Sequence, residues 1–376
     1  MKDEAKLQNL KDFENKSLLI VDDDNPFRER LARAMEKKGF EVFQAESVQK
    51  GVESVKIKKP GFAVVDLRLG DGNGLEVVKE IQSSNSDSRI IMLTGYGNIP
   101  TAVAAIKSGA IDSANFSDKE IALMCASHQG EEGHIKTAKS MLEKLNLSVE
   151  NYECGSHLPS NKKVRYDMIQ QEISPTSLHN NCSGKHAGML ALGTYLGKGI
   201  NGYTKKNHPV QKTIINYVSE LSGIEKIHYE VDGCSAPTPF LSLESIARLF
   251  QQLAAAKKPE LKRVFDAMVS HPMLVGGSNN FDSTFIKALM GRGITKVGGE
   301  SVRGVALKTK EYGPIGIAIK VLDGNFRALP IATMKFLEHL ELLTDQEREK
   351  LSQYRTKILK NHNNIEIGRI EAYIDF

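Results

Sequence analysis

Acidic and hydroxyl side chains stand at the ends of three short apolar segments in the first hundred residues. Asp22 and Asp23 follow SLLIV, Asp66 lies at the end of FAVVDL, and Thr94 lies near the end of RIIMLTG. Clustered carboxylates repel one another unless a cation neutralises them, and hard oxygen ligands suit Mg²⁺. A metal-held Asp66 could then attack a phosphoryl donor, and Thr94 could sense the added oxygens. A single aspartate is more simply explained by the polarity of strand ends, but the matched set favours a site.

The elements that must position these side chains alternate regularly along the chain. Apolar strand-like runs (17–21, 40–45, 62–67 and 89–95) are separated by segments with helical spacing of apolar residues (27–39, 47–59, 74–83 and 100–110). This rhythm predicts a parallel sheet covered by helices on both faces. In such sheets the ligand site gathers at the carboxyl ends of the strands, where the aspartates and the threonine lie.

Residues 15–113 resemble the receiver domains of response regulators, closest to the global redox regulators. The motifs LLIVDDD, FAVVDLRLGDGNGLEVV and LTGYGNIPTAVAAIKSGAID carry the resemblance, and residues 1–14 precede it as a polar tail. It implies a flavodoxin-like α/β fold and phosphorylation by a sensor histidine kinase. It also implies roles for five residues: Asp66 as phospho-acceptor, Thr94 as the switch hydroxyl, and Asp22, Asp23, Asp66 and the carbonyl of Arg68 as ligands of Mg²⁺.

The resemblance to receivers stops near Phe116. After GAID the family has a fifth strand ending in a Lys-Pro pair and then a fifth helix, but Phe116 occupies the register of that lysine. We therefore expect a truncated receiver. We also expect the stretch 110–116 to be a junction without a flexible linker.

Turns rich in small and polar residues carry a second set of candidate side chains. LHNNCSGKHAGMLAL places Cys182 and Lys185 before a helix of small residues, and Cys234 lies in a Gly-Cys-Ser turn before another helix. Two thiolates and a neutral amine would make an unusual zinc site with one open position. The spacing alone is a weak signal for zinc. An isolated cysteine is about as often a small buried hydrophobic residue as it is a functional one. Ser127 follows IALMCA, which we expect to be a strand, and a lone serine there is more often a plain turn residue.

Residues 116–376 resemble the L-asparaginase II family, whose fold is of the serine-β-lactamase-like α/β type. The motifs that match in order include FSDKEIALMCASHQGE, LHNNCSGKHAGML, DGCSAPTP, FDSTF, KVGGESV and GIAIKVLDG. The resemblance implies hydrolysis of the side-chain amide of L-asparagine to aspartate and ammonia. It implies a catalytic hydroxyl at Ser127 with Lys296 as its partner, and Lys320 as a second candidate for that lysine. The zinc ligands of the family fall on Cys182, Lys185 and Cys234.

The family also has an earlier segment with a Ser-x-x-Lys pair, nucleophile and base, which the receiver-like sequence replaces here. Ser47 with Lys50 and Ser160 with Lys163 have the same spacing, but both pairs lie in polar segments, and we expect neither to stand in. Three hypotheses therefore stay open. The chain is an asparaginase-like amidohydrolase, a phospho-accepting receiver, or an inert fusion of the two.

The bulk composition limits the classes of partner. A length of 376 residues allows two domains, and the net charge of +4 gives no reason to expect nucleic acid or a membrane. The polar start MKDEAKLQNLKDFENK lacks the apolar run of a signal peptide, so we expect a cytoplasmic protein. The expected partners are L-asparagine and a histidine kinase, with a homodimer allowed.

Overall fold

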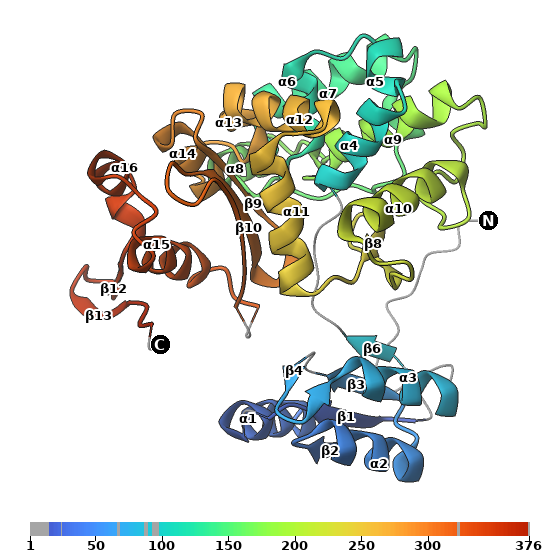
Figure 1. The fold of residues 1–376 in the computed structure, drawn as a ribbon, viewed down its shortest axis with the longest axis vertical. Helices are drawn as coiled ribbons and strands as arrows, with labels where there is room; N and C mark the ends of the chain where they lie inside the picture. Colours follow the sequence, from blue (N-terminus) through green and yellow to red (C-terminus); the bar gives the residue numbers. More distant parts are fainter. Residues whose placement is uncertain are drawn as a thin grey trace. The chain divides into compact units, whose positions relative to one another are not determined.

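The computed structural model describes residues 15–23, 25–65, 68–85, 89–91, 98–321 and 324–374. The chain forms two compact units, Met1–Leu93 and Thr94–Phe376 (Figure 1). Across the described ranges, every helix falls short of the length and apolar character that a membrane span requires.

The first unit is built on a parallel sheet with the strand order β2-β1-β3-β6 (Figure 1). Its elements are β1 (Ser17–Val21), α1 (Asn25–Glu36), β2 (Glu41–Ala45), α2 (Val48–Lys58), β3 (Phe62–Val65), α3 (Leu75–Ser84) and β6 (Arg89–Ile91). A short antiparallel pair, β4 (Arg68–Leu69) and β5 (Gly72–Asn73), precedes α3. The alternation of strands and helices predicted from the sequence is confirmed.

Strand β1 is the centre of this unit because both of its faces are buried. Leu18 and Ile20 belong to one core cluster with Ala32 of α1. Leu19 and Val21 belong to another, which includes buried side chains of α2 and α3. The period-two alternation of β1 thus supplies both layers of the core.

The second unit is a mixed α/β fold. Its helices are α4 (Asn98–Lys107), α5 (Ala110–Ser113), α6 (Asp118–Met124), α7 (Glu132–Lys144), α8 (Lys162–Gln170), α9 (Ser183–Tyr195), α10 (Pro209–Ser222), α11 (Leu243–Ala255), α12 (Pro259–Ser270), α13 (Pro272–Val275), α14 (Phe281–Ala288), α15 (Leu329–His339) and α16 (Asp345–Lys350). Its antiparallel sheet has the order β11-β10-β9, with β9 at Gly293–Val297, β10 at Val302–Lys308 and β11 at Pro314–Lys320. Two hairpins complete it, β7 (Tyr229–Val231) with β8 (Pro237–Pro239), and β12 (Lys357–Lys360) with β13 (Glu366–Ile370).

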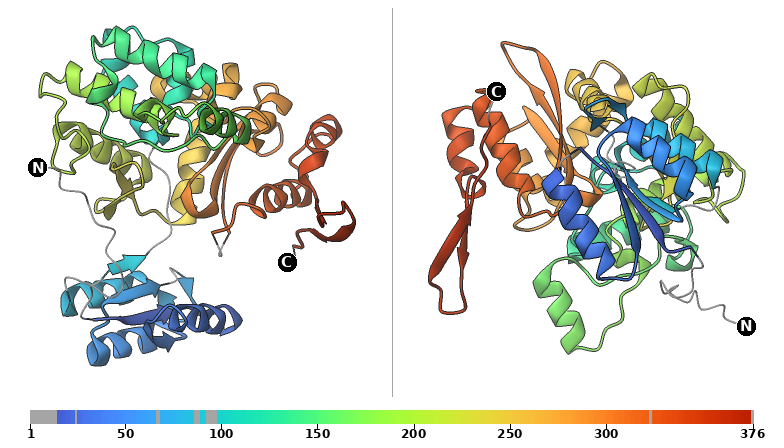
Figure 2. Two further views of the ribbon diagram at one scale, coloured as in Figure 1. Left: turned by 180° about the vertical axis from the view of Figure 1, so that it is seen from behind. Right: turned by 90° about the horizontal axis from the view of Figure 1, so that it is seen from below.

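Helix α11 lies against the antiparallel sheet, as Figure 1 and the left view of Figure 2 show. Gly316 of β11 permits this approach, because a Cβ atom there would lie 1.9 Å from the carbonyl oxygen of Ala247 in α11. Any larger residue at position 316 would push the helix away from the sheet.

Helix α4 packs within the second unit, although its sequence was assigned above to the receiver. It lies against α9, α10 and α12, and every residue from Asn98 to Ala105 is buried. The division between compact units therefore lies between Leu93 and Thr94, well before the sequence-based boundary at residues 113–116. The small side chains of Ala102, Ala104 and Ala105 allow neighbouring helices to approach from several sides.

The expectation of a strand before Ser127 is wrong, because residues 118–124 form the helix α6. Ser117 and Glu120 make a capping box at its start, and the backbone N–H of Ser117 donates to the Glu120 carboxylate at 2.7 Å. The sequence Ser-Asp-Lys-Glu contains this signal. The apolar run that suggested a strand reflects a helix buried on all sides instead.

Candidate active site

The side chains of Ser127 and Lys296 meet inside the second unit. Ser127 follows the C-terminal end of α6, and Lys296 lies on β9. The ammonium or amine nitrogen Nζ of Lys296 lies 2.7 Å from Oγ of Ser127 and also donates to the carbonyl of Val297. Only 3% of the surface of Lys296 is exposed, so this contact is shielded from water. The fold thus brings together two residues that the sequence analysis paired.

Burial favours the neutral form of Lys296, which can accept a proton. Removal from water lowers the pKa of Lys296 to about 8, even though the carboxylate of Asp282 acts in the opposite direction. Asp282 is itself held in a buried ion pair with Arg303. A substantial fraction of Lys296 is therefore neutral near pH 8, and a neutral amine can accept the proton of a serine hydroxyl.

The position of Lys296 is fixed by the sheet that carries it. Lys296 is paired with Gly304 of β10 in the antiparallel register. The next residue, Val297, donates its backbone N–H to Oδ2 of Asp282 at 2.9 Å. Because these bonds hold the strand on both sides of Lys296, its side chain extends from a rigid base.

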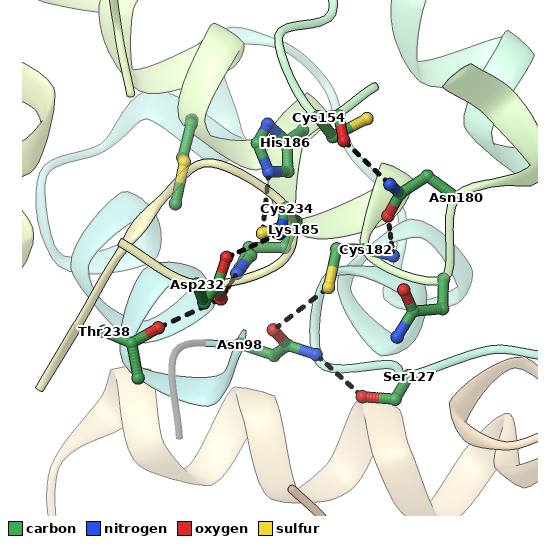
Figure 3. Close-up of polar contacts among 12 residues, drawn as sticks. Asn98, Ser127, Cys154, Asn180, Cys182, Lys185, His186, Asp232, Cys234 and Thr238 are labelled. Carbon is green, nitrogen blue, oxygen red and sulfur yellow. Dashed lines mark hydrogen bonds and ion pairs between the residues drawn. The ribbon is translucent and has the colours of Figure 1, made fainter. Parts of the chain in front are cut away.

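Asn98 is a third member of the site, and the sequence analysis gave it no role. Its Nδ2 lies 3.2 Å from Oγ of Ser127 and also donates to the carbonyl of Ala126. Its Oδ1 lies 3.9 Å from Sγ of Cys182 (Figure 3). No motif marks Asn98 in the sequence, because only the packing of α4 into this unit carries it to Ser127.

Lys320, the second candidate lysine, lies on β11 opposite Val302. Its Nζ donates to the carbonyl of Val321. The hydrogen bond to Ser127 comes from Lys296 instead. The geometry therefore favours Lys296 over Lys320 as the partner of Ser127.

Cys182 lies at the start of α9, beside the same site. Its backbone N–H donates to Oδ1 of Asn180 at 2.9 Å. Helix α9 packs tightly on α6 because position 184 is glycine, where a Cβ atom would lie 2.3 Å from the carbonyl oxygen of Leu123. A local cap and a close helix contact thus place the Cys182 thiol.

Cys234 reaches the same region from the turn between β7 and β8. Its backbone N–H donates to Oδ1 of Asp232 at 2.7 Å, and Ser235 has a φ of 71°. The left-handed conformation at Ser235 closes the turn and leaves Cys234 pointing inward, where 4% of the residue is exposed. The tight Gly-Cys-Ser turn expected from the sequence is therefore present.

The thiols of Cys182 and Cys234 lie in one cluster with Lys185, His186 and Asp232 (Figure 3). The interaction with the Cys234 thiol lowers the pKa of Cys182 to about 7, although burial acts in the opposite direction. The same interaction and burial raise the pKa of Cys234. Nζ of Lys185 lies 3.2 Å from Oδ2 of Asp232. Nε2 of His186 lies 3.2 Å from Sγ of Cys234.

A comparison with models of protein families matches most of the chain to one family. The family model described as L-asparaginase II matches residues 99–372. The chain belongs to the L-asparaginase II family. The match includes most of α4, together with Ser127, Lys296 and the residues around Cys182, and it begins one residue after Asn98.

The cluster around Lys185 fits a cation at the zinc position implied for L-asparaginase II. Burial by itself would lower the pKa of Lys185, but the sulfur atoms of Cys182 and Cys234 and the Asp232 carboxylate raise it. The surroundings thus stabilise positive charge, and two thiols with an amine are zinc donors once deprotonated. Within the described ranges no three His, Cys, Asp or Glu side chains form a set that could hold a metal ion, so such a site would need Lys185.

A second comparison concerns the N-terminal part of this L-asparaginase II family member. The family model of the response regulator receiver domain matches residues 18–115. The acid tolerance regulatory protein ActR of Sinorhizobium medicae is 59% identical over 98 residues, which are 26% of this chain and 50% of that protein. The photosynthetic apparatus regulatory protein RegA of Rhodobacter capsulatus is 57% identical over 98 residues, 26% of this chain and 53% of that protein.

The chain spans about half the length of these curated relatives. A crystal structure of a response regulator protein from Burkholderia pseudomallei, with a phosphorylated aspartic acid, is 38% identical. That similarity covers 25% of this chain and 55% of that chain, with a TM-score of 0.21. The family model and the two regulators show that residues 18–115 match a receiver domain.

The receiver site is described in part. Asp22 and Asp23 follow β1, and Oδ2 of Asp23 accepts a hydrogen bond from the backbone N–H of Gly70 at 3.0 Å. Arg68 begins β4, whereas Asp66 and Thr94 lie outside the described residues. Carboxylates at the carboxyl end of a central parallel strand form a donor set that suits Mg²⁺, as receiver domains generally bind it.

The Ser47 hydroxyl has a structural role in the receiver. Its Oγ accepts a hydrogen bond from the backbone N–H of Lys50 at 3.1 Å, which makes Ser47 the N-cap of α2. The Lys50 ammonium forms an exposed ion pair with Glu46. The structure thus explains this Ser-x-x-Lys spacing as a helix cap followed by an exposed lysine.

Proposed function

We propose that the second unit hydrolyses the side-chain amide of L-asparagine, with Ser127 as nucleophile and Lys296 as base. The observation that carries the proposal is the buried contact of 2.7 Å between Nζ of Lys296 and Oγ of Ser127. Membership of the L-asparaginase II family supports the choice of substrate. This dyad does not depend on the Ser-x-x-Lys segment that the receiver-like sequence replaces.

The reaction follows from the protonation of the dyad. Neutral Lys296 takes the proton of Ser127 while Oγ attacks the amide carbon and the carbonyl π bond opens. The tetrahedral intermediate collapses, and the leaving nitrogen takes the proton from Lys296 and departs as ammonia. Lys296 then takes a proton from a water molecule as the water attacks the ester on Ser127, and it returns that proton to Oγ as the ester bond breaks and aspartate is released.

We also propose that Cys182, Lys185 and Cys234 hold zinc in this unit. Zinc held by these three residues would supply a Lewis acid to this unit. Burial alone would raise the pKa of Asp232, but the attraction of Lys185 and the hydrogen bonds from Cys234 lower it to about 2. Asp232 therefore stays ionised and would balance the charge that zinc adds. One equivalent of zinc in the purified protein, lost in Cys234→Ser, supports this assignment, and a metal-free wild type contradicts it.

Ammonia release from L-asparagine by the purified full-length chain tests the catalytic proposal. Ser127→Ala and Lys296→Met are expected to lower the rate by about a thousandfold, since each removes half of a nucleophile–base pair. Ser160→Ala serves as the matched serine control and keeps the wild-type rate. A wild-type rate no higher than that of Ser127→Ala would reject the proposal and favour an inert fusion.

A second proposed function belongs to the receiver. We propose that Asp66 accepts a phosphoryl group with the help of Mg²⁺ and that Thr94 senses the product. The position of Asp22 and Asp23 supports this, because they follow β1, the strand adjacent to β3. The natural phosphoryl donor would be a histidine kinase. Incubation with labelled acetyl phosphate and Mg²⁺ should label the wild type and leave Asp66→Asn unlabelled. Equal labelling of the two proteins would reject this assignment.

The location and assembly are proposed with the same functions. We infer a cytoplasmic protein, since both asparagine and phosphoryl donors are available there. Nucleic acid is not among the proposed partners, given the small net charge of +4, and a homodimer is allowed. Fractionation of cells and sedimentation of the purified chain test these two points.

A further inference from the structure

The amide of Asn98 makes contacts that fix its orientation next to Ser127. Nδ2 faces the carbonyl oxygen of Ala126, which can only accept a hydrogen bond. The same nitrogen therefore faces Oγ of Ser127, at 3.2 Å, as a donor (Figure 3). Oδ1 is left on the side of the Cys182 thiol, 3.9 Å from Sγ.

A count of hydrogen bonds at Ser127 shows what this donor does. A serine hydroxyl has one proton and two lone pairs. Asn98 occupies one lone pair, so the proton of Ser127 cannot point toward Nδ2. Lys296, at 2.7 Å, is then the available acceptor whenever it is neutral. The amide thus favours the rotamer in which Ser127 donates to its base.

The same contact strengthens as the reaction begins. When Oγ loses its proton it carries negative charge, and a hydrogen bond to a charged oxygen is about twice as strong as one to a neutral oxygen. In the ester that forms afterwards, Oγ is a poorer acceptor. A donor held in place before the reaction therefore stabilises the attacking state more than the states before and after it.

We propose that Asn98 is a catalytic residue of the Ser127–Lys296 pair, whose amide N–H directs the serine proton to Lys296 and stabilises the attacking oxygen. This inference rests on the proposed function, because it assumes that Ser127 is the nucleophile. Asn98 belongs to the helix whose sequence also matches the receiver family. The segment 98–107 thus contributes to the active site as well as to the core.

The test measures the reactivity of Ser127 directly, without asparagine. Phenylmethanesulfonyl fluoride forms a sulfonate ester with a reactive serine and releases fluoride and a proton. The adduct on Ser127 is quantified by mass spectrometry in wild type, Asn98→Leu and Asn98→Asp from pH 6 to 10. Asn151→Leu is the matched control, since the side chain of Asn151 accepts local hydrogen bonds from the backbone and hydroxyl of Ser148.

Loss of the donor should lower the labelling rate in the high-pH plateau by about tenfold to a hundredfold in both Asn98 variants. In Asn98→Leu the midpoint of the pH profile should stay near that of the wild type, since Lys296 is unchanged. In Asn98→Asp the midpoint should move to higher pH, because the new carboxylate favours the charged form of Lys296. A shifted midpoint with an unchanged plateau would mean a merely structural role. Asn98→Asp, which keeps the size of the side chain, decides the question if Asn98→Leu does not fold.

Two outcomes separate this inference from the proposed function. If wild-type Ser127 is labelled and both Asn98 variants are labelled at the same rate, the role of Asn98 is rejected and the dyad stands. If wild-type Ser127 is not labelled at any pH, the proposed nucleophile is rejected together with this inference.

Discussion

Helices α2 and α4 both come from sequence that matches a receiver domain, but they are packed very differently. In α2 the buried residues are Val48, Gly51 and Val55, a single stripe at helical spacing that lies on the parallel sheet. In α4 every residue from Asn98 to Ala105 is buried. The first helix covers a sheet and faces water with its other side, whereas the second is enclosed by α9, α10 and α12.

This difference shows why one segment can match two families. The receiver model ends at residue 115 and the L-asparaginase II model begins at residue 99, so both include most of α4. A helix of small apolar residues satisfies a pattern that requires one apolar face as well as a pattern that requires several. The surrounding helices decide where such a segment packs, and here they place it in the second unit.

The largest expected effect comes from a charge placed in α4. Ala104→Glu should destabilise the second unit by at least about 3 kcal/mol, because the position is 1% exposed and a carboxylate there has no partner. Ile57→Glu in α2 is the matched control, since Ile57 is 76% exposed and should accept a charge with little change. Thermal unfolding measures the stability of both variants, and hydrogen exchange then shows which unit is destabilised.

The location of the damage is as informative as its size. Faster hydrogen exchange in residues 114–374, with residues 15–93 unaffected, would support the packing of α4 described above. Faster exchange in the receiver sheet alone would mean that α4 belongs to the receiver, and the boundary at residue 93 would have to be moved.

The next effect concerns pH and separates the two units by chemistry. Burial lowers the pKa of Lys296 to about 8, and the neutral amine is the active form. The rate of ammonia release should therefore rise about tenfold per pH unit below pH 8 and level off above it. Acetyl phosphate labelling of the receiver should show no step at this pH.

Lys296→Arg is the control for this profile, because arginine stays charged throughout and cannot accept the serine proton. It should remain inactive from pH 6 to 10. A wild-type rate that is flat across pH 8 would contradict the assignment of Lys296 as the base.

A smaller effect is expected where α6 begins, after the stretch that was predicted to be a junction. Burial alone would raise the pKa of Glu120, but hydrogen bonds from Lys144 and Ser117 outweigh it and keep the pKa below its usual value. Glu120→Gln should cost about 2 kcal/mol at pH 7 through lost charge-assisted hydrogen bonds. The contribution of the carboxylate is present above its unfolded-state pKa and is lost as the pH falls through the folded-state pKa.

Urea unfolding at pH 7 and at pH 3.5 measures this change. The difference between wild type and Glu120→Gln should shrink at the lower pH. A difference that is the same at both values would show that the carboxylate charge contributes nothing.

The sequence contained enough information for the receiver sheet but not for the complete active site. The alternation of apolar runs predicted β1, β2 and β3, because each strand buries its side chains within a local repeat of strand and helix. The pairing of Ser127 with Lys296 came from family motifs, since residues 169 positions apart carry no local signal. Asn98 was missed because its role depends on which unit encloses α4, a question of tertiary packing that an apolar pattern leaves open.

The smallest expected effect lies in the receiver and completes the comparison of α2 with α4. Asp71 accepts hydrogen bonds from the backbone N–H groups of Val48 and Gln49 at the start of α2, at 2.8 and 3.1 Å, and these bonds lower its pKa. Asp71→Ala should lower the unfolding midpoint of the receiver slightly at pH 7 and leave the second unit unchanged. The effect should vanish at a pH below the folded-state pKa of Asp71, because the protonated carboxyl is a weaker acceptor. Equal shifts in both units would mean that they unfold together, and α2 could then no longer be treated as a helix whose stability depends on its own sheet alone.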